Sequence, residues 1–152
     1  MFEDVKSLLK DIPELVELLS YSIVPAPEPE ELEQIVEEYR TNPSCRIYAL
    51  AYEDEWIGII GYEKQENGVI EIRHIAVHPG MRGSGFGRGL ILELIGVEED
   101  AKELYAVTTD EMAVDFFRNI GFTIESIDEL YPGIERFRCR YLIDESVIDE
   151  DE

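Results

Sequence analysis

Apolar residues recur at helical spacing through the first 42 residues of the chain. They form two short groups on either side of a proline at position 13: Val5, Leu8, Leu9 and Ile12, followed by Leu15, Val16, Leu18 and Leu19. A clearer i, i+3, i+4, i+7 stripe predicts a surface helix over residues 30–39. We therefore expect a helical N-terminal part over residues 1–42 with no evident first strand, and we interpret the many glutamates of its last helix as a solvated face.

Strand patterns follow this helical part. Residues 46–52 and 56–63 are rich in apolar residues and are joined by a short acidic segment, which predicts a hairpin. Asn67-Gly68 is a strong signal for the next turn. After this turn, residues 69–77 predict a third strand.

Helix and strand patterns alternate in the rest of the chain. An apolar helix covers residues 90–97, where Gly96 is placed to end it, and a strand covers residues 104–108. Asp110 can cap a following helix over residues 111–120, and Gly121 can end it.

Residues 122–127 and 136–143 predict a closing pair of strands. Three arginines alternate with apolar residues in the second of these strands: Arg136, Arg138 and Arg140. We expect this basic face to pair with surface carboxylates rather than with an anionic ligand. The whole pattern indicates one α/β domain over residues 1–143, followed by an acidic tail, 144–152, that we expect to be disordered.

The segment between the third strand and the apolar helix carries the strongest functional signal. It reads Val77-His-Pro-Gly-Met-Arg82-Gly-Ser-Gly85-Phe-Gly87-Arg-Gly-Leu. Glycines let the backbone turn its N–H groups inward without a Cβ clash. Such a turn, followed by a helix N-terminus, suits a phosphate group. The segment therefore predicts a binding site for a phosphate-bearing cofactor.

The charge pattern supports this interpretation. The chain has 35 acidic residues among 152, yet residues 72–92 contain none. The same window carries three arginines and both histidines of the chain: Arg73, Arg82, Arg88, His74 and His78. Carboxylates would repel a polyanion, whereas arginines would attract it.

Two common phosphate-binding motifs do not fit this loop. The motif G-x-x-x-x-G-K-[ST] needs a lysine, and none stands nearby. The motif G-x-G-x-x-G fails from Gly83 and from Gly85, because its last position is then Arg88 or Leu90. The arrangement that fits is R-x-x-G-x-G, over residues 82–87.

Two motifs in the same order resemble the GCN5-related N-acetyltransferases. The first is the strand and loop from Ile75 to Gly87, and the second, A-x-x-F-F-x-x-x-G-F, runs from Ala113 to Phe122. The resemblance extends from about residue 46 to residue 141. It implies a mixed, mostly antiparallel central sheet that is splayed at the cofactor site and flanked by helices. It also implies acetyl transfer from acetyl-coenzyme A to a primary amine, by direct attack on the thioester.

The resemblance assigns roles to the loop and to the strand before it. Backbone groups of Ile75, Ala76 and Val77 would pair with the pantetheine arm of coenzyme A. N–H groups from Arg82 to Gly87 would hold the pyrophosphate, and Arg82 and Arg88 would add charge. The cofactor-binding residues are thus Ile75, Ala76, Val77, Arg82, Gly83, Ser84, Gly85, Phe86, Gly87 and Arg88, among which the Phe86 side chain is expected to anchor the helix in the core.

Glu71 is the candidate for the catalytic base. An alkylammonium group must lose a proton before it attacks, and a carboxylate can accept that proton, directly or through water. Glu71 lies on the loop-bearing strand, where some members place their base. The alternative is that Glu71 pairs with Arg73 or faces solvent.

The chain departs from the family at two positions. Phe117 stands where many members carry a tyrosine that protonates the leaving thiolate, and Asp110 stands where asparagine is frequent. Thr108, Tyr131, Tyr141 or water are the candidates that remain for the missing acid.

Composition limits the partners. A net charge of −22 argues against nucleic acid and favours a cationic amine, in a small molecule or a peptide. No apolar run or leader pattern predicts a membrane span or secretion. Cys45 and Cys139 have no metal or disulfide spacing, so we expect free core thiols, no metal and a cytoplasmic protein. The sequence leaves open whether the protein forms a homodimer.

Two other interpretations stay open. One is a non-catalytic coenzyme A-binding regulatory module, which the phenylalanine at position 117 and the absence of an evident first strand favour. The other is a structural α/β domain whose glycines form only a tight turn.

Overall fold

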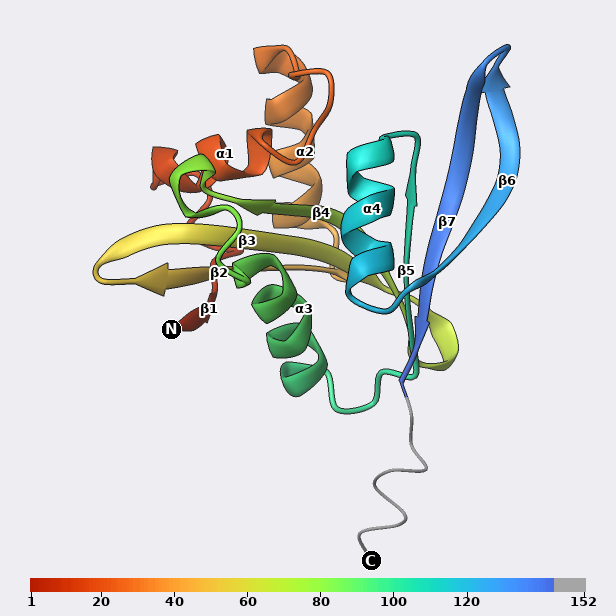
Figure 1. Cartoon of the computed structure of the whole chain (residues 1–152). Coiled ribbons are helices and arrows are strands. Elements are labelled where there is room, and N and C mark those ends of the chain that lie inside the picture. Colours follow the sequence, from red (N-terminus) through yellow and green to blue (C-terminus); the bar gives the residue numbers. More distant parts are fainter. Residues whose placement is uncertain (144–152) are drawn as a thin grey trace, which may run out of the picture. The chain divides into compact units, whose positions relative to one another are not determined.

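The computed structural model describes residues 1–143 of the chain (Figure 1), so the predicted acidic tail lies outside the described residues. The described residues form two compact units. The first comprises Met1–Lys64 and Ile72–Glu99, and the second comprises Gln65–Glu71 and the residues from Asp100 onward.

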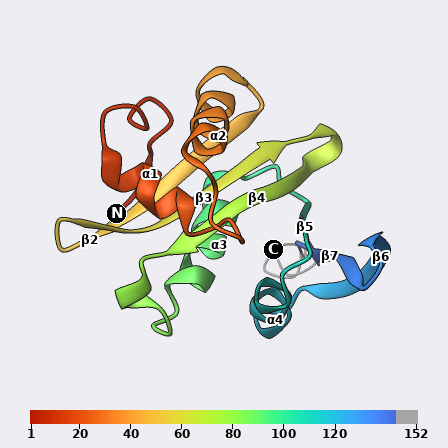
Figure 2. The same cartoon turned by 90° about the horizontal axis from the view of Figure 1, so that it is seen from above.

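The first unit is a sheet with helices on both faces. Its elements are β1 (Phe2–Asp4), α1 (Pro13–Ser20), α2 (Pro29–Thr41), β2 (Cys45–Tyr52), β3 (Glu55–Lys64), the greater part of β4 (Val69–Val77), and α3 (Phe86–Val97). β1 pairs with β2, and β2 with β3, in antiparallel ladders that place Ile47 opposite Gly61. The helices α1 and α2 lie on one side of these strands and α3 on the other (Figures 1 and 2).

Two glycines of β3 explain how closely the helices of the first unit approach its sheet. Gly61 lies beneath the ring of Tyr39 from α2, whereas Gly58 lies against the side chain of Leu90 from α3. Side chains alternate between the two faces of a strand, so residues 58 and 61 face opposite layers. Each helix therefore packs where β3 has no side chain.

The N-terminal prediction was wrong in two respects. A three-residue strand, β1, is present, and residues 6–11 form turns rather than a helix. The backbone N–H of Val5 donates to the Ile47 carbonyl (3.1 Å), which ties the start of the chain to β2. The first helix begins only at Pro13, where the missing N–H costs nothing. The predicted helix over residues 30–39 is confirmed as α2.

The prediction for the end of α3 was also wrong. Gly96 lies inside the helix, which continues to Val97 and has Glu98 as its C-cap residue. The Glu98 carboxylate accepts a hydrogen bond from the Tyr62 hydroxyl (2.7 Å) and forms an ion pair with Lys64 (3.0 Å). Contacts with β3, rather than a glycine, therefore fix this helix end.

The second unit contains β5 (Glu103–Thr108), α4 (Glu111–Asn119), β6 (Thr123–Tyr131) and β7 (Ile134–Leu142). β5 pairs antiparallel with β7, and β6 and β7 form a hairpin longer than predicted. The Asp110 side chain accepts from the Met112 N–H (3.1 Å), and Gly121 has a φ of 105°, so the predicted start and stop of α4 are confirmed.

The arginines of β7 behave as expected. Each forms an ion pair with a carboxylate of the same unit: Arg136 with Asp128, Arg138 with Glu125, and Arg140 with Glu103. The predicted free core thiols are confirmed as well, because both cysteines are reduced and fully buried.

Hydrogen bonding within residues 1–143 orders seven strands as β1-β2-β3-β4-β5-β7-β6. The β4–β5 pair is parallel, whereas the pairs β1–β2, β2–β3, β5–β7 and β6–β7 are antiparallel. This mixed, mostly antiparallel sheet with flanking helices confirms the predicted fold class. Among the helices of the described residues, none is long and apolar enough to cross a membrane.

Candidate functional site

β4 delivers the chain to the glycine loop at a fixed point of the first unit. The His78 N–H donates to the Ile57 carbonyl of β3 (2.7 Å), immediately after the last residue of β4. A single 3₁₀ turn follows, Pro79–Met81, in which Nδ1 of His78 accepts from the Gly80 N–H (3.1 Å). The start of the loop is therefore held by the backbone and by one histidine side chain.

The glycines of the loop have backbone conformations that other residues rarely adopt. Gly83 and Gly85 both have a φ of 83°, and nothing lies within 4 Å of the position that a Cβ would occupy on either. Space does not demand glycine here, but backbone geometry does. The backbone therefore has positive φ at both residues, with open space beside each of them.

No side-chain cap or acidic residue of the first turn occupies the free N–H groups at the N-terminus of α3. Gly85 is the N-cap residue and provides no side-chain hydrogen bond, and the first turn contains no acidic residue. The first N–H groups of a helix lack partners within the helix and carry partial positive charge. The end of the loop can therefore accept an anion.

The arginines of the acid-free window have different surroundings. Arg73 pairs with Glu38 (3.3 Å) and Glu63 (3.1 Å), so its charge is already balanced. Arg82 and Arg88 are exposed, and neither forms an ion pair with a carboxylate of residues 1–143. The loop thus has two arginines that could form ion pairs with an anionic ligand.

The other residues predicted to bind the cofactor lie in the loop and in the strand before it. Ser84 is exposed at the tip of the loop, and Phe86 is half-buried with its ring 5.9 Å from that of Tyr52. The parallel ladder between β4 and β5 comprises Val69–Glu71 and Glu103–Tyr105, so Ile75–Val77 lie beyond its last pair.

Glu71, the predicted base, is half-buried and lies opposite Tyr105 in that ladder. It belongs to the second unit, whereas the glycine loop belongs to the first. Its role therefore stays a prediction.

The second unit also contains the residues considered for the acid. Phe117 is 3% exposed, and its ring packs against those of Phe116 and Phe122. The Thr108 hydroxyl accepts from the Asp110 N–H (3.0 Å), which occupies it at the start of α4. Tyr131 is 65% exposed on β6, and Tyr141 stacks on Phe122. Phe117 has no proton to donate.

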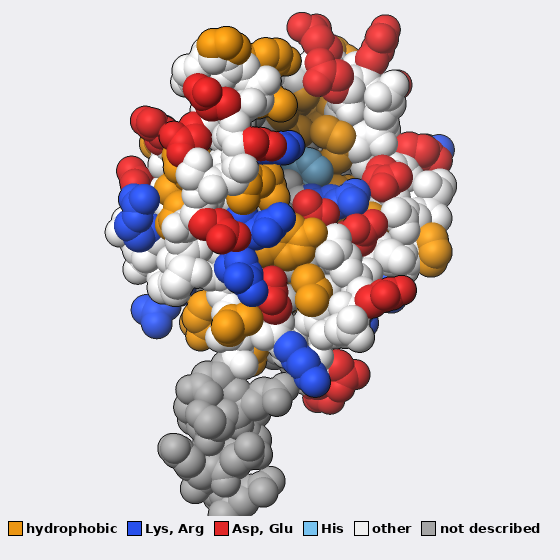
Figure 3. Space-filling model, turned by 90° about the vertical axis from the view of Figure 1, so that its right-hand side faces the viewer, with side chains coloured by type: hydrophobic (Ala, Val, Ile, Leu, Met, Phe, Trp, Pro, Cys, Tyr) orange, Lys and Arg blue, Asp and Glu red, His pale blue; other side chains and the backbone are white. Residues whose placement is uncertain are grey.

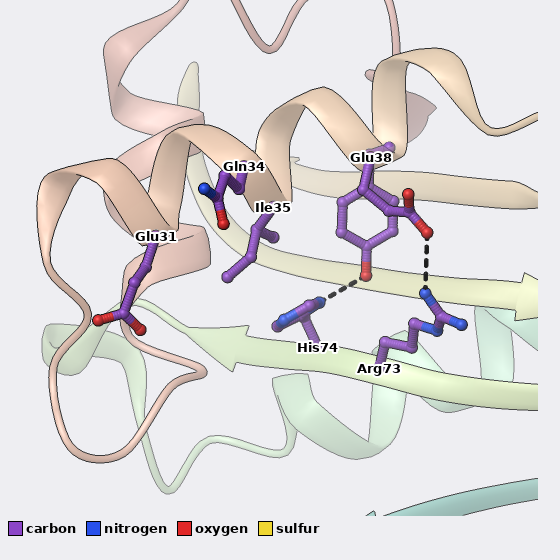
Figure 4. Close-up of a pocket in the computed structure, with 7 residues that line it drawn as sticks. Glu31, Gln34, Ile35, Glu38, Arg73 and His74 are labelled. Carbon is purple, nitrogen blue, oxygen red and sulfur yellow. Dashed lines mark hydrogen bonds and ion pairs between the residues drawn. The ribbon is translucent and has the colours of Figure 1, made fainter.

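Sequence reasoning missed a cavity of about 320 Å³ between α2 and β4 (Figure 4). Its walls come from one face of α2 and from two consecutive residues of β4: Glu31, Gln34, Ile35, Glu38 and Tyr39, with Arg73 and His74. A signal was available, because positions 31, 34, 35 and 38 follow the i, i+3, i+4, i+7 rule for one helix face. The glutamates of this helix were interpreted as a solvated face, and Ile35 as part of its apolar stripe.

A hydrogen bond joins the two walls of this cavity. Nδ1 of His74 lies 2.6 Å from the Tyr39 hydroxyl, and Tyr39 itself is only 1% exposed. Burial, and secondarily the Arg73 charge, lower the pKa of His74 to about 4. The imidazole is therefore neutral at neutral pH.

Acidic side chains are spread over the face of the molecule in Figure 3, with basic ones among them. This distribution fits the net charge of −22. Within residues 1–143, no three His, Cys, Asp or Glu side chains gather in a way that could hold a metal ion.

The model of the acetyltransferase (GNAT) family matches residues 7–122, more than two thirds of the chain, and includes β4, the loop and α4. The chain belongs to the GNAT family. The match confirms the predicted resemblance and extends it into the N-terminal region, where sequence reasoning had found little likeness.

Individual relatives of this GNAT protein agree. It is 32% identical over 73 residues to an uncharacterized N-acetyltransferase of Bacillus methanolicus, a match that covers 48% of this chain and 60% of that protein. An acetyltransferase of the GNAT family from Desulfovibrio desulfuricans has a similar fold, with a TM-score of 0.76, 20% identity and coverage of 95% and 99% of the two chains. A Bacillus subtilis acetyltransferase in complex with coenzyme A gives a TM-score of 0.72, 21% identity and coverage of 94% and 98%.

Proposed function

We propose that this GNAT protein is an acetyl-coenzyme A-dependent N-acetyltransferase that acts on a primary amine. The observation that carries the proposal is the loop over residues 82–87. Two glycines with positive φ lead into a helix N-terminus without a side-chain cap, and beside it stand two exposed arginines that form no ion pair within residues 1–143. The coenzyme A complex of the Bacillus subtilis acetyltransferase supports the same ligand for this chain.

The loop and β4 would divide the binding of the donor between them. N–H groups from Arg82 to Gly87 donate to the pyrophosphate, and the side chains of Arg82 and Arg88 add charge. Backbone groups of Ile75–Val77 pair with the pantetheine arm as an added strand would. Their place beyond the last pair of the β4–β5 ladder supports this assignment.

In the reaction, the amine nitrogen attacks the thioester carbon directly. A C–N bond forms, the C–S bond breaks, and sulfur leaves with the electron pair as thiolate. Glu71 accepts the proton that nitrogen loses, directly or through one water. A thiol with a pKa near 8.5 is a tolerable leaving group without an acid, so Phe117 does not prevent turnover. Holding both reactants together supplies much of the acceleration.

The acceptor would be cationic, because a net charge of −22 attracts ammonium groups. Polyamines, amino sugars and peptide amines all fit this description. A second candidate function is a regulatory module that binds coenzyme A without catalysis. The buried Phe117, in a position where many GNAT enzymes carry a proton donor, favours it.

Calorimetry with acetyl-coenzyme A, followed by measurement of free thiol release with a panel of amines, tests the proposal. Binding and turnover support the enzyme, whereas binding without turnover of any amine supports the regulatory module. If neither acetyl-coenzyme A nor coenzyme A binds, both candidate functions are wrong.

Glu71→Gln tests the base. We expect kcat to fall by about 10²–10⁴-fold while the affinity for acetyl-coenzyme A is unchanged. Glu66→Gln is the matched control, because Glu66 is an exposed carboxylate of the same unit. If the two variants lose activity equally, Glu71 is not the base.

A further inference from the structure

The α2 residues that line the cavity between α2 and β4 extend over about two turns of the helix. Glu31 lies at one end of its α2 wall and Glu38 at the other, and the His74 ring from β4 points into the space between them (Figure 4). Glu31 and Ile35 are four residues apart, or about 6 Å along the axis. The volume of about 320 Å³ is at the lower end of the range for ligand pockets. The cavity therefore suits a small, extended molecule.

The charges around this cavity favour a cation. Arg73 is balanced by Glu38 and by Glu63, which leaves that group with a negative excess. Glu31 forms no ion pair or hydrogen bond with any described residue and is exposed at the other end. His74 is neutral, so it does not repel a positive ligand. A carboxylate without a partner and a neutral imidazole thus face the same space.

Carbon atoms cover the wall between these polar groups. The Ile35 side chain projects from α2 toward His74 (Figure 4), and Tyr39 also lines the cavity. The apolar surface suits the methylene groups of a ligand. Together, the residues that line the cavity suit a ligand with a short aliphatic chain and a nitrogen at each end.

His74 has one ring nitrogen to offer. Its Nδ1 is engaged with the Tyr39 hydroxyl. In the tautomer whose Nδ1–H donates to that oxygen, Nε2 carries a lone pair and accepts a hydrogen bond. His74 also immediately precedes Ile75 in β4. A nitrogen bound at Nε2 would therefore lie beside the backbone assigned to the pantetheine arm.

We propose that this cavity binds the acceptor and that the acceptor is an aliphatic diamine. Its distal ammonium pairs with Glu31, and its reacting nitrogen donates a hydrogen bond to Nε2 of His74. The inference rests on the proposed function, and the acyl transfer itself is the step given above. Extended chains of four and five carbons place their nitrogens about 6 Å and about 7.5 Å apart, lengths close to the rise of about 6 Å from Glu31 to Ile35.

Calorimetry on the full chain tests this directly, with 1,4-diaminobutane and 1,5-diaminopentane compared with butylamine and pentylamine. We expect each diamine to bind more tightly than its matched monoamine by about two- to fivefold, the size of one exposed ion pair. Glu31→Gln removes this advantage and leaves monoamine binding within twofold. Glu33→Gln is the control, because it removes the same charge from α2 at an exposed position outside the cavity lining.

Equal binding of diamines and monoamines would overturn the proposal. So would a diamine advantage that survives in Glu31→Gln, or one that Glu33→Gln removes equally. Acetyl-coenzyme A is titrated into the same samples, and its failure to bind counts against the proposed function alone. Diamine selectivity that depends on Glu31 supports the cavity assignment in either case.

Discussion

Gly61 permits the contact between β3 and α2 that positions Tyr39. A Cβ at this position would lie 2.8 Å from Cε1 of the Tyr39 ring and closer still to its Cζ and hydroxyl oxygen. Carbon atoms in folded proteins do not approach so closely. Gly61→Ala must therefore displace the ring, which is only 1% exposed.

The size of the effect follows from two contributions. Overpacking of a filled core costs about 1–3 kcal/mol. Displacement of the ring also breaks the hydrogen bond between Tyr39 and His74, which adds about 1 kcal/mol. Replacement of glycine also lowers the conformational entropy of the unfolded chain, which stabilises the folded protein by about 0.4–1 kcal/mol. We therefore expect Gly61→Ala to lower the free energy of unfolding by about 1–3.5 kcal/mol, which corresponds to a fall in Tm of about 2–14 °C.

Gly58→Ala is the matched control, because it places the same methyl group on the opposite face of the same strand. Its Cβ would lie 3.1 Å from Cδ1 of Leu90, so that this side chain needs to move by only a few tenths of an ångström. We expect a change of less than about 1 kcal/mol. Thermal and urea unfolding of both variants, followed by circular dichroism, give the comparison. Equal stabilities for the two variants would refute the packing argument.

Two further predictions concern the loop and the cavity histidine. Gly85→Ala forces a side chain onto a φ of 83° without any clash, so we expect affinity for acetyl-coenzyme A to fall about tenfold, from about 1–2 kcal/mol of strain. Gly89→Ala is the control, because Gly89 lies within α3 and its substitution is also free of clashes. It should leave the affinity for acetyl-coenzyme A unchanged and stabilise the helix by up to about 1 kcal/mol. If calorimetry shows the same affinity for Gly85→Ala and Gly89→Ala, the conformational role of Gly85 is excluded. The pKa of His74 is lowered from 6.5 to about 4 in the folded protein. Between these two pH values, His74 therefore binds a proton in the unfolded chain but not in the folded protein. Stability should therefore fall as the pH drops from about 6.5 to about 4, by at most about 3 kcal/mol. Urea midpoints measured against pH should show this loss in the wild type but not in His74→Gln, and parallel curves would contradict it.

Local signals in the sequence were sufficient for the part of the molecule that carries the loop. The bounds of β4, the turn at Asn67-Gly68 and the cap at Asp110 depend on neighbouring residues, and all three were predicted correctly. The glycine loop belongs to the same class, because its conformation follows from residue types at adjacent positions. Short-range structure of this kind can be inferred from one sequence.

The features that were missed depend on residues distant in the chain. β1 is three residues long and exists only because β2 lies beside it, more than forty residues later. The cavity needs α2 and β4 to face each other, and the bond between Tyr39 and His74 joins positions 35 residues apart. Gly61 gave no turn signal, because it is required for space rather than for backbone conformation. No periodicity within a single element contains this information.

Contacts at the C-terminal end of α3 limit where the glycine loop before this helix can move. Tyr62 and Lys64 hold the Glu98 carboxylate at that end, whereas the N-terminal turn has no side-chain cap. A helix anchored in this way cannot slide along its axis when a ligand arrives. If the proposed function is correct, we expect adjustment to a bound diphosphate to occur at Gly83 and Gly85, where the backbone has positive φ and open space beside it.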